Sequence, residues 1–181
     1  MKVTASAVSA FTLFHLALAN FDLYRGTDVT AVPDDNPEPA LDVWQVFDGE
    51  PDCDDASSAQ TWDDSDDVSG DKFGVVYEPR PADPSDPGAA TRVEMNFHDT
   101  DPVYHFTIYK DRNYDMIGLD GNTYGNCVPF PGDDYQCNYP LPLGDRVLSG
   151  ARFFRCTTDL TAQQINEVNG KKRSVKIAVK F

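Results

Sequence analysis

The sequence predicts a mainly β protein: an antiparallel sheet or a small sandwich, with one short helix in its C-terminal half and two disulfides. Three observations lead to this expectation. Apolar and polar residues alternate in several short runs, which proline, glycine and aspartate separate. One segment alone carries clear signals of a helix start. The four cysteines are an even number in a chain that begins like an exported protein.

Residues 1–19 have the pattern of a secretory signal peptide. Lys2 provides a positive start, residues 3–19 carry no charge, and Ala17-Leu18-Ala19 is a cleavage sequence. The apolar run is shorter than the roughly 20 residues that cross a bilayer, so we expect no membrane anchor. We therefore expect a secreted, extracellular protein, in a setting where disulfides form.

Cleavage would leave an acidic mature chain of about one domain. It would have 162 residues (181 − 19) and a net charge of −16, because the removed segment takes one basic residue from a chain of charge −15. This charge disfavours nucleic acid and anionic lipid as partners. We expect a monomer without a cofactor, whose partner is an extracellular protein or a glycan.

Residues 20–40 are expected to form a flexible N-terminal segment, and residues 41–181 a single β-rich domain. Residues 32–39 contain three prolines and three acidic residues, a composition that favours extended, solvated chain. Residues 20–24 could still form a short edge strand.

The domain begins with a strand at residues 41–47, which is apolar on both faces and is therefore expected to be central. Residues 91–98 and 103–109 form the best-marked hairpin, around a turn at 99–102. Further strands are expected at residues 73–77, 152–156 and 175–181, the last of which could close the sheet.

One helix is expected from about residue 162 to residue 168. Thr161 and Gln164 make a capping box, and Leu160 can pack against Ile165 one turn later.

The cysteines allow three pairings, of which we favour Cys127 with Cys137 and Cys53 with Cys156. Gly132-Asp133 lies between Cys127 and Cys137 and marks a turn that would bring these two sulfurs together.

Six short segments lie along most of the mature chain. They are Phe21-Asp22-Leu23-Tyr24, Val43-Trp44-Gln45-Val46-Phe47, Val93-Glu94-Met95-Asn96-Phe97, Phe106-Thr107-Ile108-Tyr109-Lys110, Gly125-Asn126-Cys127 and Phe154-Arg155-Cys156. Together they resemble a group of uncharacterised small secreted cysteine-containing proteins of filamentous fungi. The resemblance implies secretion and an effector-like or host-interaction role, and it implies no reaction and no site residues.

Residues 106–114 also are similar to the opening strand and turn of the βγ-crystallin Greek key. Met116 stands where that motif has a glycine, and the calcium pattern of that family has no full match in this chain.

The hairpin gathers polar side chains on one face of the sheet. With a turn at residues 99–102, strand alternation separates the polar residues of both strands from the apolar ones. The polar face would carry Glu94, Asn96, His98, His105 and Thr107, with Asn96 opposite His105 and Glu94 opposite Thr107.

Four residues of this region are candidate catalytic residues: Glu94, His98, His105 and, as a cation, Arg92. Secreted ribonucleases perform acid–base chemistry with a Glu/His pair and a nearby arginine, and a divalent metal could also bind such a face. Alternation alone predicts an ordinary solvent-facing surface here, which is the simpler interpretation.

The acidic stretch between residues 48 and 67 could bind calcium, because carboxylates are hard oxygen ligands. The candidate ligands are Asp54, Asp55, Asp63, Asp64, Asp66 and Asp67. A solvated acidic loop is the alternative interpretation.

Lys171-Lys172-Arg173 resembles a dibasic processing site of secretory-pathway proteases, although a loop before a last strand explains it as well.

The sequence favours a secreted, non-enzymatic interaction protein that is effector-like or associated with the cell surface or wall. The alternatives are a small secreted hydrolase of the ribonuclease kind and a calcium-stabilised extracellular module.

Overall fold

The structure is a computed structural model that describes residues 20–31, 39–83, 85–98 and 104–167. The predicted signal peptide, the predicted last strand, the hairpin turn and the dibasic sequence lie outside these residues. The strands are β1 (Asn20–Ala31), β2 (Leu41–Phe47), β3 (Trp62–Asp63), β4 (Gly74–Glu78), β5 (Arg92–Asn96), β6 (His105–Tyr109), β7 (Asp115–Gly118), β8 (Thr123–Leu141) and β9 (Gly144–Thr158). The helices are α1 (Cys53–Ser58) and α2 (Ala162–Glu167).

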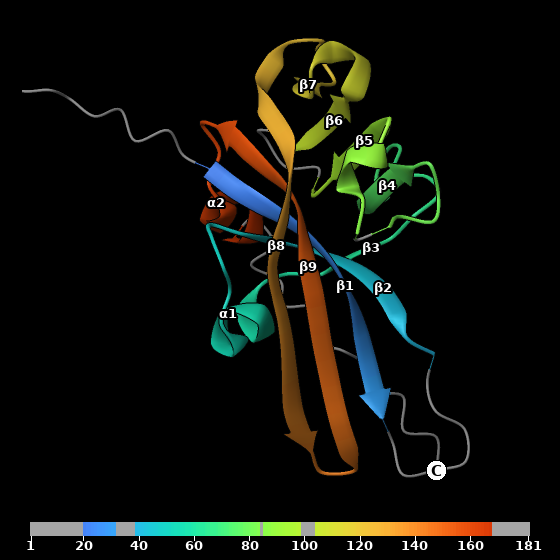
Figure 1. Cartoon of the computed structure of the whole chain (residues 1–181), viewed down its shortest axis with the longest axis vertical. Helices are drawn as coiled ribbons and strands as arrows, with labels where there is room; N and C mark the ends of the chain where they lie inside the picture. The colour runs from blue at the N-terminus through green and yellow to red at the C-terminus, as the bar shows by residue number, and fades with distance from the viewer. Residues whose placement is uncertain (1–19, 32–38, 84, 99–103, 168–181) are drawn as a thin grey trace, which may run out of the picture.

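All nine strands belong to one sheet of antiparallel neighbours, which confirms the predicted fold class. The strand order is β3-β2-β1-β9-β8-β7-β6-β5-β4, and the long β8–β9 pair extends away from β4–β7 (Figure 1). The two ends of the order meet, because Asp64 forms a parallel bridge with Val75. The sheet is therefore rolled up and encloses one core.

The inner face of this rolled sheet is apolar. Trp44 of β2 contacts Tyr77 of β4 with ring centroids 6.2 Å apart, although these strands lie near opposite ends of the strand order. Residues from every strand join this core: Phe21, Leu23, Trp44, Val46, Trp62, Val75, Tyr77, Val93, Met95, Phe97, Phe106, Ile108, Met116, Cys127, Phe153, Phe154 and Cys156. Burial of this apolar surface is the main force that stabilises the fold.

Several predicted elements have the expected positions. Strand β2 has the predicted bounds and lies between β1 and β3 with both faces buried. Asn96 pairs with His105 and Glu94 pairs with Thr107, as the hairpin required. The capping box of α2 is also present, because the backbone N–H of Gln164 donates to Thr161 Oγ1 at 3.1 Å.

Two segments differ from expectation. Residues 20–31 are not a flexible segment with an edge strand, because they form the 12-residue strand β1 between β2 and β9. Phe21 and Leu23 point into the core and are fully buried, which explains why the strand is central. The expected loop around Gly132 is part of β8, which passes this point by two irregularities in its pairing with β9 instead of turning back.

The disulfide pairing predicted from the sequence was wrong. The bonds join Cys53 to Cys137 and Cys127 to Cys156. Cys127 and Cys156 are direct cross-strand partners on β8 and β9, and both are fully buried. Because β8 does not turn at Gly132, Cys137 is carried along the strand and away from Cys127.

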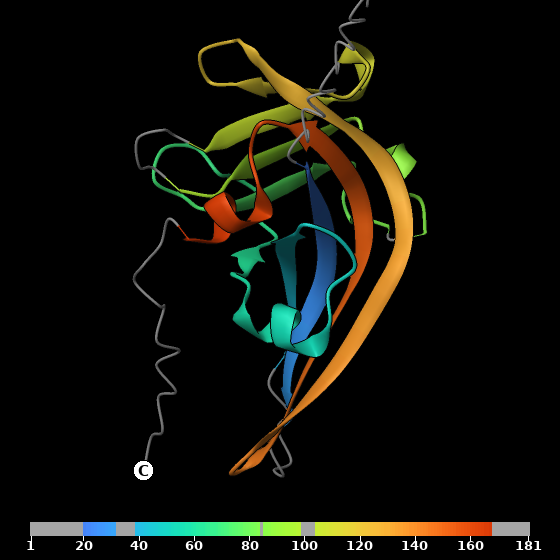
Figure 2. The same cartoon turned by 90° about the vertical axis from the view of Figure 1, so that its left-hand side faces the viewer.

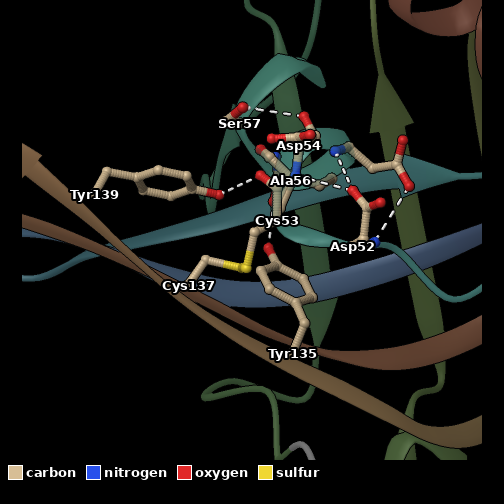
Figure 3. Close-up of a disulfide and its surroundings, with 10 residues drawn as sticks. Asp52, Cys53, Asp54, Ala56, Ser57, Tyr135, Cys137 and Tyr139 are labelled. Atoms are coloured by element: carbon tan, nitrogen blue, oxygen red, sulfur yellow. Dashed lines mark hydrogen bonds between the residues drawn. A yellow bond between two sulfur atoms is a disulfide. The ribbon is translucent and has the colours of Figure 1, made fainter.

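The Cys53–Cys137 disulfide joins α1 to β8 (Figure 3). Helix α1 was not predicted from the sequence, although Asp52 caps it by accepting hydrogen bonds from the backbone amides of Asp54 and Asp55. Beside the bond, the Tyr139 hydroxyl donates to the Cys53 carbonyl at 2.6 Å. A second, smaller apolar cluster lies beneath α1 and contains Tyr24, Val43, Phe47, Ala56, Cys137 and Leu148.

Candidate functional site

A groove lies at one end of the rolled sheet, between the start of β6, the β7–β8 turn and the segment before α2. It has a volume of about 640 Å³, which is within the usual range of ligand sites. The residues that matter most for its chemistry are Tyr104, Phe106, Leu119, Asp120, Tyr124 and Leu160. Figure 2 shows the β7–β8 turn and α2 projecting on the same side of the sheet. We call this feature the open-end groove.

Three aromatic side chains form one wall of the open-end groove. The Tyr104 and Phe106 rings lie stacked with centroids 6.4 Å apart. The Phe106 and Tyr124 rings are also in contact, with centroids 5.3 Å apart. Tyr104 and Phe106 are buried, whereas Tyr124 is 44% exposed and Leu119 is 71% exposed. The wall therefore has a buried floor and an exposed apolar rim, where a ligand could bury further apolar surface.

The local sequence explains the position of Tyr124. A Cβ atom on Gly118 would lie 2.5 Å from Tyr124 Cε2, so only glycine allows this ring to lie over the end of β7. The Asp120 carboxylate accepts a hydrogen bond from the backbone N–H of Asn122 at 3.0 Å and another from the Tyr124 hydroxyl at 2.9 Å. The turn and the ring thus hold each other in place.

The charge of the open-end groove is negative. Hydrogen bonds from the Asn122 amide and the Tyr124 hydroxyl lower the pKa of Asp120, and the same carboxylate raises the pKa of Tyr124. At neutral pH Asp120 is therefore ionised and Tyr124 is neutral. A second carboxylate, the exposed Asp159, also lines the groove. Aromatic faces beside carboxylates suit a ligand that offers apolar surface together with cationic or hydroxyl groups.

The structure also brings together three of the four candidate catalytic residues, Arg92, Glu94 and His105, on the outer face of the sheet, and His105 lines the open-end groove as well. His105 Nε2 lies 2.8 Å from Glu94 Oε1, and Arg92 Nη1 donates to Glu94 Oε2 at 2.6 Å. Arg92 also binds both carboxylate oxygens of Glu78, at 2.8 and 3.1 Å. The fourth candidate, His98, is buried and contacts the Tyr104 ring, with centroids 4.2 Å apart.

These groups largely satisfy one another. Both oxygens of Glu94 have a partner, and Arg92 is shared between two carboxylates, so an incoming phosphate would have to displace them. His105 is only 5% exposed. The Asn96 side chain donates to the backbone carbonyls of the 68–72 segment, which therefore lies against this face. The arrangement resembles a cross-strand ion-pair network more than an open catalytic cleft.

The candidate calcium ligands have other partners or lie apart. Asp64 lies 3.2 Å from Arg25 and 3.4 Å from Arg80, and Asp66 also binds Arg80. Asp67 binds Lys72. Asp54 and Asp55 belong to the first turn of α1, and Asp63 ends β3. Within the described ranges, no three His, Cys, Asp or Glu residues gather in a way that could hold a metal ion. The calcium-stabilised module stays a prediction without geometric support.

The open-end groove was not predicted from the sequence. Residues 118–122 carry turn signals, but their position beside Phe106 depends on the β6–β7 and β7–β8 pairings. The one available signal was the alternation of Tyr104 and Phe106, which was assigned to the core.

Comparisons of the chain with protein-family models, with curated proteins and with solved structures give no match. Among the described residues, no helix is long and apolar enough to span a membrane.

Proposed function

We propose that this chain is a secreted, non-enzymatic interaction protein that binds an extracellular protein or glycan through the open-end groove. The observation that carries the proposal is the aromatic wall of Phe106 and Tyr124 beside the carboxylate of Asp120. Leu119 supports the proposal. Its side chain is 71% exposed at the rim, and covering it with a partner would stabilise the complex. An effector-like or wall-associated role agrees with this surface.

Export is the first part of the proposal. Two disulfides are typical of proteins that mature in an oxidising compartment. When the full chain is expressed in a secretory host, we expect a protein in the medium whose first residue is Asn20 by N-terminal sequencing or mass spectrometry. Retention in the cell with residues 1–19 still attached would contradict this part.

Binding through the open-end groove is the second part. We expect an array of extracellular glycans and cell-surface proteins to identify a ligand whose affinity falls at least 10-fold in Tyr124→Ala, as for a well-packed aromatic at the centre of an interface. Leu41→Asp is the matched control, because Leu41 is 59% exposed at the start of β2 and does not line the groove. Ligands that bind wild type and Tyr124→Ala equally would contradict a role for this groove.

A hydrolase of the ribonuclease kind is the second candidate function, and the 2.8 Å contact between His105 and Glu94 is the observation that favours it. Our leading proposal predicts that the purified protein leaves RNA intact. The alternative predicts cleavage that falls at least 100-fold in Glu94→Gln, the usual size of a general acid–base contribution. Glu78→Gln is the control, since Glu78 binds Arg92 but not His105. Cleavage with this pattern of losses would replace the leading proposal.

A further inference from the structure

We infer that residues 174–181 of the chain are an intramolecular ligand of the open-end groove. This inference rests on the proposed function of the groove as a binding site, and it names the occupant of the groove before an external partner binds. Residues 168–181 lie outside the described part of the chain, so the inference uses their sequence and the point at which they begin.

Charge complementarity is the first support. Residues 168–181 contain Lys171, Lys172, Arg173, Lys176 and Lys180 and no acidic residue, so they carry a charge of +5. The rest of the chain then has a net charge of −20 (−15 − 5). The open-end groove presents the carboxylates of Asp120 and Asp159. A basic segment attached to so acidic a body is attracted to it, and carboxylates within an apolar site give that attraction a definite place.

The apolar pattern is the second support. Residues 174–181 read Ser-Val-Lys-Ile-Ala-Val-Lys-Phe, in which Val175, Ile177, Val179 and Phe181 alternate with the lysines or with small residues. If these residues bind in an extended conformation, their apolar and basic side chains fall on opposite sides of the chain. The groove offers matching surfaces, because Leu119 and Leu160 are apolar and Asp120 is ionised at its rim.

The starting point of the segment is the third support. Helix α2 ends at Glu167, and it begins two residues after Leu160, which lines the groove. A helix of six residues is about 9 Å long, and the six residues 168–173 can span up to about 20 Å, so residue 174 can reach the groove. A short tether of this kind gives an effective concentration of about millimolar, so even weak affinity would fill the site.

The dibasic sequence Lys171-Lys172-Arg173 lies within this tether. A protease specific for paired basic residues would hydrolyse the bond after Arg173 with one water, leaving a carboxylate on Arg173 and an amine on Ser174. The released octapeptide would lose its effective concentration and dissociate.

The test uses the full exported chain, residues 20–181, at low concentration. A zero-length carbodiimide cross-linker joins amines to carboxylates that are in contact, and mass spectrometry locates the link. We expect a link within one chain from Lys176 or Lys180 to Asp120 or Asp159, and we expect Asp120→Asn/Asp159→Asn to lose it. Links only between two chains, or only to carboxylates outside the groove, would overturn the inference.

A second measurement covers the case in which the cross-linker fails to react. The synthetic octapeptide of residues 174–181 is titrated into wild type and into Val175→Asp/Ile177→Asp, in which the tethered segment no longer matches an apolar site. We expect the peptide to bind this variant at least 10-fold more tightly than wild type, and equal or absent binding would overturn the inference.

If these tests fail while Tyr124→Ala still loses an external ligand, the proposed function stands alone. If they succeed while no external ligand depends on Tyr124, the groove has only its internal ligand.

Discussion

Replacing Asp22 by alanine is expected to lower the free energy of unfolding by about 3–5 kcal/mol, the usual result of breaking a buried ion pair. Asp22 is 1% exposed and lies between two arginines of β9. Its Oδ1 accepts from Arg155 Nε at 2.7 Å, and its Oδ2 accepts from Arg155 Nη2 at 2.7 Å and from Arg152 Nη1 at 3.1 Å. Alanine would leave the buried Arg152, which is 4% exposed, with the partly exposed Asp133 as its remaining carboxylate partner.

The surroundings of Asp22 increase the expected loss. Arg152 Nε donates to the Phe130 carbonyl at 2.8 Å, and the Phe130 ring lies 4.3 and 4.5 Å from the guanidinium carbons of Arg152 and Arg155. The network therefore joins β1, β8 and β9 at one point. The hydrogen bond to the Asp22 carboxylate also raises the pKa of Arg155, and Asp22→Ala would remove this effect.

Urea unfolding of Asp22→Ala and Asp28→Ala gives a matched comparison. Asp28 lies on the same strand and binds Arg146 at 2.7 and 2.9 Å, but both side chains are partly exposed. A partly solvated pair of this kind contributes up to about 1 kcal/mol. Equal losses in the two variants would contradict the structural role that we assign to Asp22.

The second large effect is expected on removal of the Cys53–Cys137 disulfide. This bond closes a loop with a sequence separation of 84 residues, for which the loss of chain entropy in the unfolded state predicts about 4–5 kcal/mol. Measured values for native disulfides are about 2–5 kcal/mol. We expect Cys53→Ala/Cys137→Ala to fall within this range by urea unfolding.

The pairing itself can be checked at the same time. Non-reducing peptide mapping should recover Cys53 with Cys137 and Cys127 with Cys156. Cys127→Ala/Cys156→Ala serves as the comparison, because its loop has a sequence separation of only 29 residues and the predicted loss is about 3–4 kcal/mol. A mapped pair of Cys127 with Cys137 would contradict the course of β8.

Local patterns predicted much of this fold. The bounds of β2, the register of the β5–β6 hairpin and the capping box of α2 depend on residues that are close in sequence, and all three are present. The contact of Glu94 with His105 followed from the same register. These features need only alternation and turn chemistry, which a sequence displays directly.

Long-range pairing was less predictable. Arg152 and Arg155 are three residues apart, so a regular strand would place them on opposite faces. The β1–β9 pairing is irregular between Leu23 and Tyr24, so Phe153 has no pairing partner on β1. Both arginines can then reach Asp22. The course of β8, the disulfide pairing and the open-end groove likewise depend on how distant strands meet.

The most direct test of the account is to locate the bound ligand on the protein. Hydrogen–deuterium exchange should be measured with and without the glycan or protein that the array identifies. We expect new protection at residues 118–120, 123–124 and 158–160, which line the open-end groove. Protection confined to α1, or to β5 around Glu94, would contradict the groove as the binding site.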